Sequence, residues 1–307
     1  MPYPSGPTTA WTAWHLHLGS DSRALQSRVA TEVIGPVVAG IGGRPWFFLR
    51  YWQAGPHLRL RVGDLDPALD TWTEGELRDR MAVVGRPRDG EEPVDPTTYQ
   101  STAGRFAAVE EMAGDPVEAL REAGVYRSVY VPEVDRYGGR DLMGESERLF
   151  HLSSDLVLGF LSSPSAARPR AAALRATVAA AAATGDGAEQ ALFYAYGVLA
   201  WREHAARLGC SAEQIEKLCS VAGSPAAPDP ADHGPFARFH QALADLAARV
   251  RRDTPLHPGA VVSSHVHMLH NRLGLGLLEE LRTYAWLAHA VPVGDRAGAV
   301  RFEGGHR

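Results

Sequence analysis

The stretch WFFLRYWQAGPHLRLRV, residues 46–62, constrains the fold of this 307-residue chain more than any other. Its two apolar and aromatic runs flank a turn at 54–56, which predicts an antiparallel hairpin. Side chains alternate between faces along a strand, so His57, Arg59 and Arg61 project to one side of the second strand. This ladder is either a solvent-exposed strand face or a site that binds an anion. The second reading is possible because an arginine guanidinium can bind a carboxylate through two hydrogen bonds.

The order of strand-like and helix-like segments predicts the fold class. Alternating patterns are found in the first half, at 11–19, in the hairpin and at 125–134. Helices are expected at 22–42 with a break near Gly35-Pro36, at 67–82, over parts of 101–124 and 135–161, and at 170–183, 188–208, 211–221, 236–252 and 263–289. Strands followed by helices favour an α+β fold, with N-terminal antiparallel strands and a helix-rich C-terminal half. We expect a flexible N-terminus over 1–10, a single catalytic domain over 11–290 and a C-terminal tail over 291–307.

Composition excludes several classes of protein. A net charge of −5 and a pI of about 6.2 argue against direct nucleic-acid binding. Two cysteines, Cys210 and Cys219, fit a reducing cytoplasm better than a disulfide framework or a zinc site. The N-terminus lacks a signal-peptide pattern, and no apolar run is long enough to span a membrane. Phosphate-loop and dinucleotide-binding motifs are also missing, so no cofactor is expected.

A second stretch, YVPEVDRYGG at 130–139, contains a charged pair before two glycines. Glu133 and Arg136 are three residues apart, a spacing that allows an ion pair on one helical turn. Tyr137 then leads into Gly138-Gly139, where the backbone can adopt positive φ. The stretch is either a turn closed by a salt bridge or part of a binding site.

The third stretch lies in the predicted helix over 263–289. Ser263 or Ser264 suits its N-cap, and His267 and Asn271 share a face at i and i+4. A histidine can act as an acid or a base near neutral pH, and it can equally be a hydrogen-bonded helix residue.

Metal binding by the histidines of this helix is not expected. Of His265, His267 and His270, only the last two share a face, and no Asp, Glu or Cys of matching spacing accompanies them.

Together and in this order, the first two stretches and HMLHNRL at 267–273 resemble the glutamate-elimination domain at the C-terminal end of class I lanthipeptide dehydratases. That domain also occurs as a separate protein in thiopeptide clusters. The resemblance covers residues 11 to about 289. It implies a cytoplasmic lyase that removes glutamate from glutamylated Ser or Thr of a ribosomal precursor peptide, leaving dehydroalanine or dehydrobutyrine. It also implies a separate glutamylating subunit as a partner.

The resemblance implies roles for individual residues. We expect Arg59 and Arg61 to converge with Arg136 and His267 in one pocket. Glu133 is expected to orient Arg136. The candidate catalytic residues are Arg59, Arg61, Arg136 and His267, and the supporting residues are Arg50, His57, Glu133, Tyr137 and Asn271.

Two alternatives stay open. Thiopeptide pyridine synthases resemble the same domain and join two dehydroalanines in a formal cycloaddition with loss of the leader peptide. A precursor-binding scaffold without activity is the other. The chain also departs from the family pattern, because Ser153-Ser154 stands where an Asp-Ser pair is common.

Overall fold

A computed structural model describes residues 9–109, 118–163, 169–220, 228–229, 232 and 234–291. It divides into two compact units. Unit 1 comprises Met1–Pro132 and Ser153–Pro164, and unit 2 comprises Glu133–Leu152 and Ser165–Arg307. The predicted single domain over 11–290 stays a prediction. The predicted flexible N-terminus and C-terminal tail lie almost wholly outside the described residues.

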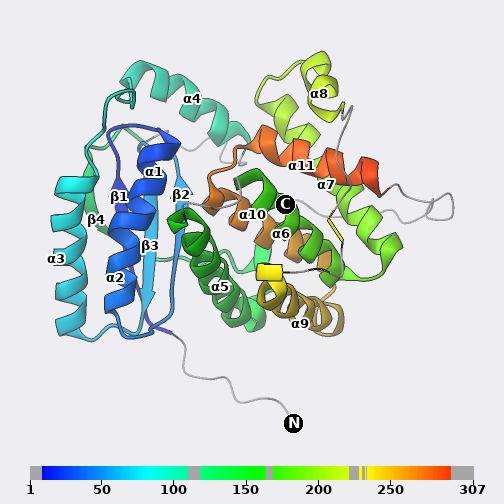
Figure 1. Cartoon of the computed structure of the whole chain (residues 1–307), viewed down its shortest axis with the longest axis horizontal. Coiled ribbons are helices and arrows are strands. Elements are labelled where there is room, and N and C mark those ends of the chain that lie inside the picture. The colour runs from blue at the N-terminus through cyan, green and yellow to red at the C-terminus, as the bar shows by residue number, and fades with distance from the viewer. Residues whose placement is uncertain are drawn as a thin grey trace, which may run out of the picture. The chain divides into compact units, whose positions relative to one another are not determined.

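Unit 1 is built on a four-stranded antiparallel sheet with the strand order β2-β3-β1-β4 (Figure 1). Its strands are β1 (Trp11–His17), β2 (Trp46–Tyr51), β3 (His57–Gly63) and β4 (Gly124–Ser128). The predicted hairpin is therefore confirmed as β2 and β3, and its turn contains two residues with positive φ, Ala54 at 58° and Gly55 at 98°. The predicted strand at 125–134 is wrong beyond Ser128, where the ladder with β1 ends.

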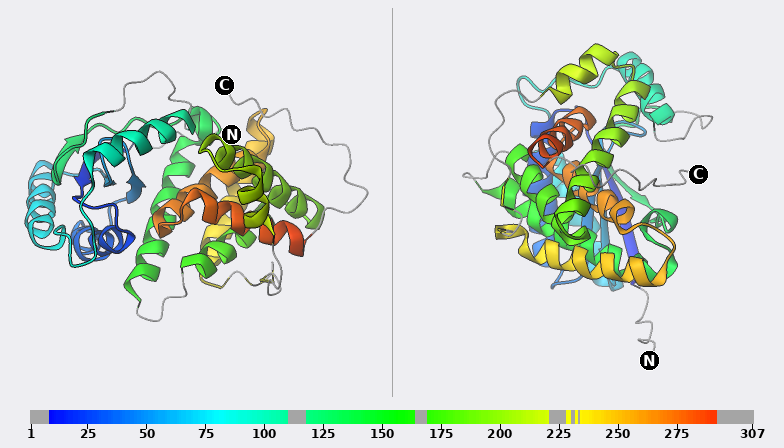
Figure 2. Two further views of the ribbon diagram at one scale, coloured as in Figure 1. Left: turned by 90° about the horizontal axis from the view of Figure 1, so that it is seen from above. Right: turned by 90° about the vertical axis from the view of Figure 1, so that its right-hand side faces the viewer.

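Helices cover one face of this sheet (Figure 2). They are α1 (Arg23–Val29), a π-helical turn η1 (Ala30–Ile34), α2 (Gly35–Gly40) and α3 (Pro67–Val84). Trp14, Phe48 and Leu60 are completely buried on this face, and burial of such large apolar side chains stabilises the unit. On the same face Arg127 of β4 binds Asp70 and Glu74 of α3.

The helix predicted over 22–42 stays helical through Pro36 instead of breaking. Pro36 has no N–H, and in a regular α-helix its ring would clash with the carbonyl four residues earlier. The Gly35 N–H donates to the Ala30 carbonyl, five residues back, so one wide π turn precedes the proline. This widening accommodates the ring and lets the chain stay helical from α1 to α2.

Two other helices of unit 1 differ from expectation. The short helix expected at 67–82 is the 18-residue α3. Only the first of the helices expected over 101–124 is described, as α4 (Pro96–Val109), and residues 118–123 are not helical.

Unit 2 is helical. Its elements are η2 (Asp135–Tyr137), η3 (Arg140–Leu142), the first half of α5 (Met143–Ser162), α6 (Pro169–Thr184), α7 (Gly187–Arg207), α8 (Ala212–Cys219), η4 (Gly234–Phe236), α9 (Ala237–Asp253), α10 (Pro258–Leu273) and α11 (Leu277–Ala290). The sheet of unit 1 and these helices confirm the predicted α+β class. In the described part of the chain, no helix is both long and apolar enough to cross a membrane.

The alanine-rich helix α6 occupies the centre of unit 2 (Figure 1). Eleven of its side chains are buried, and α7, α9, α10 and α11 all contact it. A helix that is apolar around its circumference belongs in a core. Its small side chains allow the four neighbouring helices to pack closely against it.

The single helix predicted over 263–289 is wrong, because the chain forms α10 and α11 instead. Helix α10 begins earlier, with His257 as N-cap, and the hydroxyls of Ser263 and Ser264 donate to the Ala260 carbonyl inside the helix. It ends at Gly274, whose φ of 82° is left-handed. The N–H groups of Gly274 and Leu275 donate back to the carbonyls of the last turn, a glycine C-cap that lets α11 fold back beside α10.

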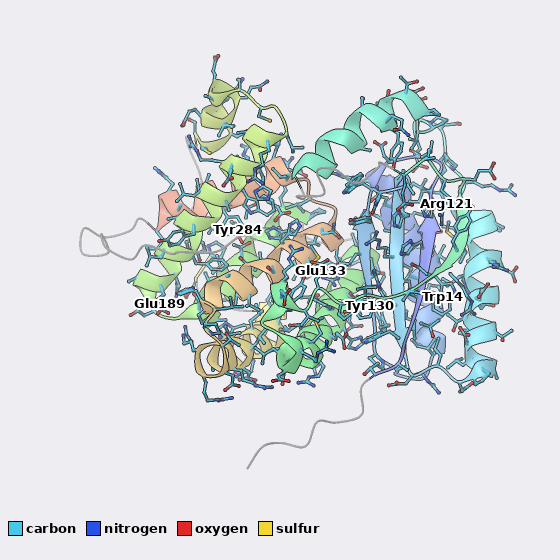
Figure 3. All side chains as sticks on the ribbon, turned by 180° about the vertical axis from the view of Figure 1, so that it is seen from behind. Trp14, Arg121, Tyr130, Glu133, Glu189 and Tyr284 are labelled. Atoms are coloured by element: carbon cyan, nitrogen blue, oxygen red, sulfur yellow. The ribbon has the colours of Figure 1, made fainter. Side chains whose placement is uncertain are left out.

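The packing of α7 against α11 predicts an unusual effect of a glycine-to-alanine change. A Cβ at Gly197 would lie 2.1 Å from the ring of Tyr284, which is buried (Figure 3). Gly197→Ala should therefore lower the free energy of unfolding by about 1–3 kcal/mol, although alanine favours helices. Urea denaturation followed by circular dichroism measures this.

Gly75→Ala is the matched control, because Gly75 lies inside α3 with open space around its Cα. It should raise the free energy of unfolding by about 0.5–1 kcal/mol. Equal effects of the two substitutions would contradict the proposed packing.

Candidate functional site

The arginine ladder lies on the sheet face opposite to helices α1 to α3. Arg59 is paired in register with His15 of β1, and Arg61 with Ala13. The Arg59 guanidinium stacks 3.3 Å from the centre of the Tyr51 ring. Arg61 is nearly buried and lies 5.5 Å from the Phe47 ring and 5.6 Å from the Tyr130 ring. Aromatic rings pack against both guanidinium groups and restrict their side-chain conformations.

His57 holds Arg59 instead of facing an anion itself. Its Nδ1–H donates to the Gly55 carbonyl at 2.9 Å, and its Nε2 accepts from Arg59 Nε at 3.2 Å. Burial is the main reason why the pKa of His57 falls to about 2, so the ring is neutral. The supporting role expected for His57 is therefore to position the Arg59 side chain.

Two histidines that sequence reasoning missed stand beside His57. His15 and His17 point to the same face of β1, and their rings stack on His57 at centroid distances of 4.7 and 4.3 Å. The pKa of His15 is lowered to about 3 and that of His17 to about 4, first by burial and then by nearby arginine charges. The alternation of WHLH at 14–17 was the available signal.

These residues line a concave pocket of about 190 Å³ within unit 1. Arg59 lies on its wall, and so does Arg121 from the segment that leads into β4 (Figure 3). The Arg121 guanidinium is 5.0 Å from the Tyr126 ring. Glu118 and Arg127 also line the pocket, and Arg127 is paired with Asp70 and Glu74. Arg59 and Arg121 outweigh the one carboxylate of Glu118, so the pocket suits a carboxylate-sized anion.

The three imidazoles could also be considered as metal ligands. One ring nitrogen of each of His15, His17 and His57 lies within 4.8 Å of the other two. Zinc requires each nitrogen about 2.0–2.1 Å from the ion. Both ring nitrogens of His57, however, already have hydrogen-bond partners. The charges of Arg59 and Arg121 would repel a dication, so the pocket fits an anion better than a metal.

Arg50 was expected to support the ladder from the partner strand. It does not approach the ladder, so that prediction is wrong. It is paired in register with Leu58, so its side chain projects to the helix-covered face. There it is buried and donates to Gln26 Oε1 at 3.2 Å and Ser27 Oγ at 3.1 Å, both on α1. Arg50 therefore ties the sheet to α1.

The second stretch forms the ion pair that its spacing predicts. Arg136 Nη1 lies 3.0 Å from Glu133 Oε2. Both side chains are exposed, so the pair orients Arg136 more than it stabilises the fold. Gly138 and Gly139 both adopt positive φ, at 90° and 101°. Tyr137 is buried against Phe150, and burial raises its pKa to about 12, which makes it a core residue.

His267 belongs to a buried cluster that sequence reasoning missed. Its Nδ1 lies 2.9 Å from Glu280 Oε1, and Nδ1 of His270 lies 3.2 Å from Glu280 Oε2. Burial alone would raise the pKa of Glu280, but the hydrogen bonds and the positive charge that the two histidines supply outweigh it, and the net pKa is lowered. The indole of Trp201 on α7 packs 5.0 Å from the His267 ring.

The break at Gly274 explains why Glu280 was missed. In one continuous helix, 13 residues would separate the two side chains by about 20 Å along the axis. The available signal was LGLG at 273–276, because glycine after a periodic apolar run marks a helix end. The expected convergence of Arg59 and Arg61 with Arg136 and His267 joins residues of two units and stays a prediction, as does the role of Asn271.

Comparison with known proteins adds a family and a fold. Residues 11–291 match the family model described as lantibiotic biosynthesis dehydratase C-term, and no curated protein matches the chain. The pyridine synthase TbtD from thiomuracin biosynthesis is similar in structure, with a TM-score of 0.67 and 19% identity over 92% of this chain and 97% of that one.

Two further solved structures share the fold. The tRNA-dependent lantibiotic dehydratase MibB from Microbispora sp. 107891 gives a TM-score of 0.56 and 19% identity over 95% of this chain, which spans only 28% of MibB. TsrL gives a TM-score of 0.54 and 15% identity over 92% of this chain and 94% of that one.

The neutral histidines predict how stability changes with pH. An unfolded histidine binds a proton near pH 6.5, whereas His15, His17 and His57 resist protonation until far lower pH. The unfolded state therefore binds more protons as the pH falls from 6.5 to 4.5, and the free energy of unfolding decreases over that window. A His57→Gln variant should show a shallower decrease in urea denaturation series at pH 7.5, 6.5, 5.5 and 4.5.

His204→Gln is the control, since His204 lies half-buried on α7 of unit 2, outside the stacked imidazoles of unit 1. The decrease in the His57→Gln series should be shallower than the decrease in the His204→Gln series. A His57→Gln series parallel to the parent would show that His57 is protonated in the folded state.

Proposed function

Because the chain belongs to the lantibiotic biosynthesis dehydratase C-terminal family, we propose that it removes glutamate from glutamylated Ser or Thr side chains of a ribosomal precursor peptide. The product is dehydroalanine or dehydrobutyrine, and the enzyme is a lyase. The observation that carries the proposal is the pair Arg59 and Arg61 on one strand face, held by aromatic rings beside a cationic pocket. Glutamate leaves with two carboxylates, and this face offers cations for them.

The reaction breaks the bond between the Cβ of the modified residue and the ester oxygen. His267 takes the Cα proton as general base, the Cα–Cβ double bond forms, and glutamate departs through its γ-carboxylate. Arg61 and Arg136 neutralise the charge that develops on this carboxylate in the transition state. Arg59, held by Tyr51 and His57, binds the α-carboxylate of the same glutamate.

The proposal implies two partners. One is the precursor peptide, and the other is a separate subunit that transfers glutamate to its Ser and Thr side chains. The reaction is placed in the cytoplasm, consistent with two free cysteines. No metal or cofactor is needed for an elimination with a base and a stabilised leaving group.

A second candidate is the pyridine synthase reaction, favoured by the structural likeness to TbtD over nearly the whole of both chains. That reaction joins two dehydroalanines and releases the leader peptide, so the enzyme does not have to bind a glutamate. Retention of both ladder arginines, Arg136 and His267 favours elimination over this alternative.

The central test uses a synthetic precursor peptide that carries glutamyl-Ser, incubated with the purified protein and followed by mass spectrometry. We expect loss of glutamate and formation of dehydroalanine. Arg61→Ala should lower kcat by about 10²–10³-fold, because it removes a charge that stabilises the leaving group. His267→Ala should lower it by about 10²–10⁴-fold, because it removes the base.

Arg80→Ala is the matched control, because Arg80 is a partly exposed arginine of α3 that pairs with Glu76 one turn earlier. It should leave kcat unchanged. If the glutamyl peptide survives and a multiply dehydrated peptide becomes a macrocycle with released leader, the protein is a pyridine synthase. If neither peptide reacts but both bind, it is a scaffold.

A further inference from the structure

We infer that Glu280 is a positioning residue that fixes His267 as its Nδ1–H tautomer. In this inference His270 is an imidazolium, and its positive charge compensates the negative charge of Glu280. His267 therefore remains neutral and can act as a base. The inference deepens the proposed elimination and rests on it for its kinetic consequences. The protonation states themselves are independent of any reaction.

The first step concerns the carboxylate. Glu280 is 1% exposed, and each of its oxygens faces the Nδ1 atom of one histidine. An ionised carboxylate can only accept hydrogen bonds. Both His267 and His270 must therefore carry a proton on Nδ1. For His267 this leaves Nε2 as the nitrogen with a lone pair.

The second step concerns the other nitrogen of His270. Its Nε2 lies 3.2 Å from the Ala173 carbonyl, which can only accept, and 3.0 Å from Thr177 Oγ1. The single hydroxyl proton of Thr177 points to the same carbonyl at 2.8 Å. A lone pair on His270 Nε2 would therefore face a carbonyl lone pair in the protein core. A proton on Nε2 satisfies the geometry, and with Nδ1–H it makes His270 an imidazolium.

The third step is the balance of charge. An unpaired charge in a core is costly, whereas a hydrogen-bonded pair of opposite charges is tolerated. His270 is completely buried and Glu280 nearly so, while His267 keeps 29% of its side chain exposed. The buried pair is therefore the ion pair of Glu280 and His270, whose net charge is zero. His267, at the surface end of the cluster, is left uncharged.

Other groups near His267 do not change this balance. On α11 it faces Glu280, which in turn is close to the buried phenol of Tyr284. On α7 it faces the indole of Trp201, and His204 contacts that same indole at 5.3 Å. On its own helix His267 shares Glu280 with His270, which carries the positive charge in this inference. Removing that charge would leave His267 as the group that must neutralise Glu280, and a protonated His267 cannot accept the Cα proton.

Ring nitrogen NMR of the full chain, with ¹⁵N-labelled histidine at pH 7.5, tests the protonation states directly. Assignments come from His267→Gln and His270→Gln. We expect His267 to show a protonated Nδ1 and an unprotonated Nε2, and His270 to show two protonated nitrogens. An Nε2–H tautomer of His267, or a neutral His270, would overturn the inference.

Kinetics on the glutamyl-Ser peptide test the consequence. Glu280→Gln and His270→Gln should each lower kcat on the order of 10²-fold with KM unchanged, because the base is misoriented or protonated while the peptide still binds. In His270→Gln the His267 ring should become doubly protonated at pH 7.5. Glu279→Gln is the matched control, because the neighbouring Glu279 caps α11 and pairs with Arg170 on the surface.

The outcomes separate the two claims. If the parent protein does not eliminate glutamate, the proposed function fails, and the NMR result still decides the tautomer. If the parent is active and Glu280→Gln matches Glu279→Gln in kcat, the positioning role of Glu280 fails while the function stands.

Discussion

The left-handed glycine at position 274 is the constraint on which the arrangement around His267 depends. It ends α10 about two turns after His267 and turns the chain so that α11 runs back along it. A buried carboxylate from α11 then reaches two histidines of α10. A side chain with a Cβ at this φ is strained, so glycine is the residue that makes the turn at little cost. The chemistry proposed for His267 follows from backbone geometry seven residues away.

The two faces of the small sheet differ in their side chains and, in our proposal, in their tasks. One face carries Trp14, Phe48 and Leu60 into a core under helices, and Arg50 ties that core to α1. The other carries arginines and stacked imidazoles that burial keeps neutral. Because strand alternation enforces the division, the second face can be polar without weakening the core.

Local patterns in the sequence predicted the hairpin, the glycines of the second stretch and the pair of Glu133 and Arg136, because each depends on residues at most a few positions apart. Arg50 was misplaced because alternation tells which residues of one strand share a face, but the register with the neighbouring strand decides which face that is. Glu280 required knowing that a helix ends. The π turn before Pro36 was not foreseen because a proline in a helical pattern ordinarily predicts a break.

The stacking of Arg59 on Tyr51 has a consequence for recognition. A long side chain that is free in solution loses rotational freedom when it binds a ligand, at a cost of roughly 1.5–2 kcal/mol for arginine. Arg59 is already confined by an aromatic ring below it and an imidazole acceptor at its Nε, so this loss occurs when the protein folds. Lysine would keep the positive charge but has neither the flat surface that stacks on the ring nor the Nε–H. The shape of the guanidinium, as much as its charge, is therefore what this strand would present to the carboxylate that we propose it binds.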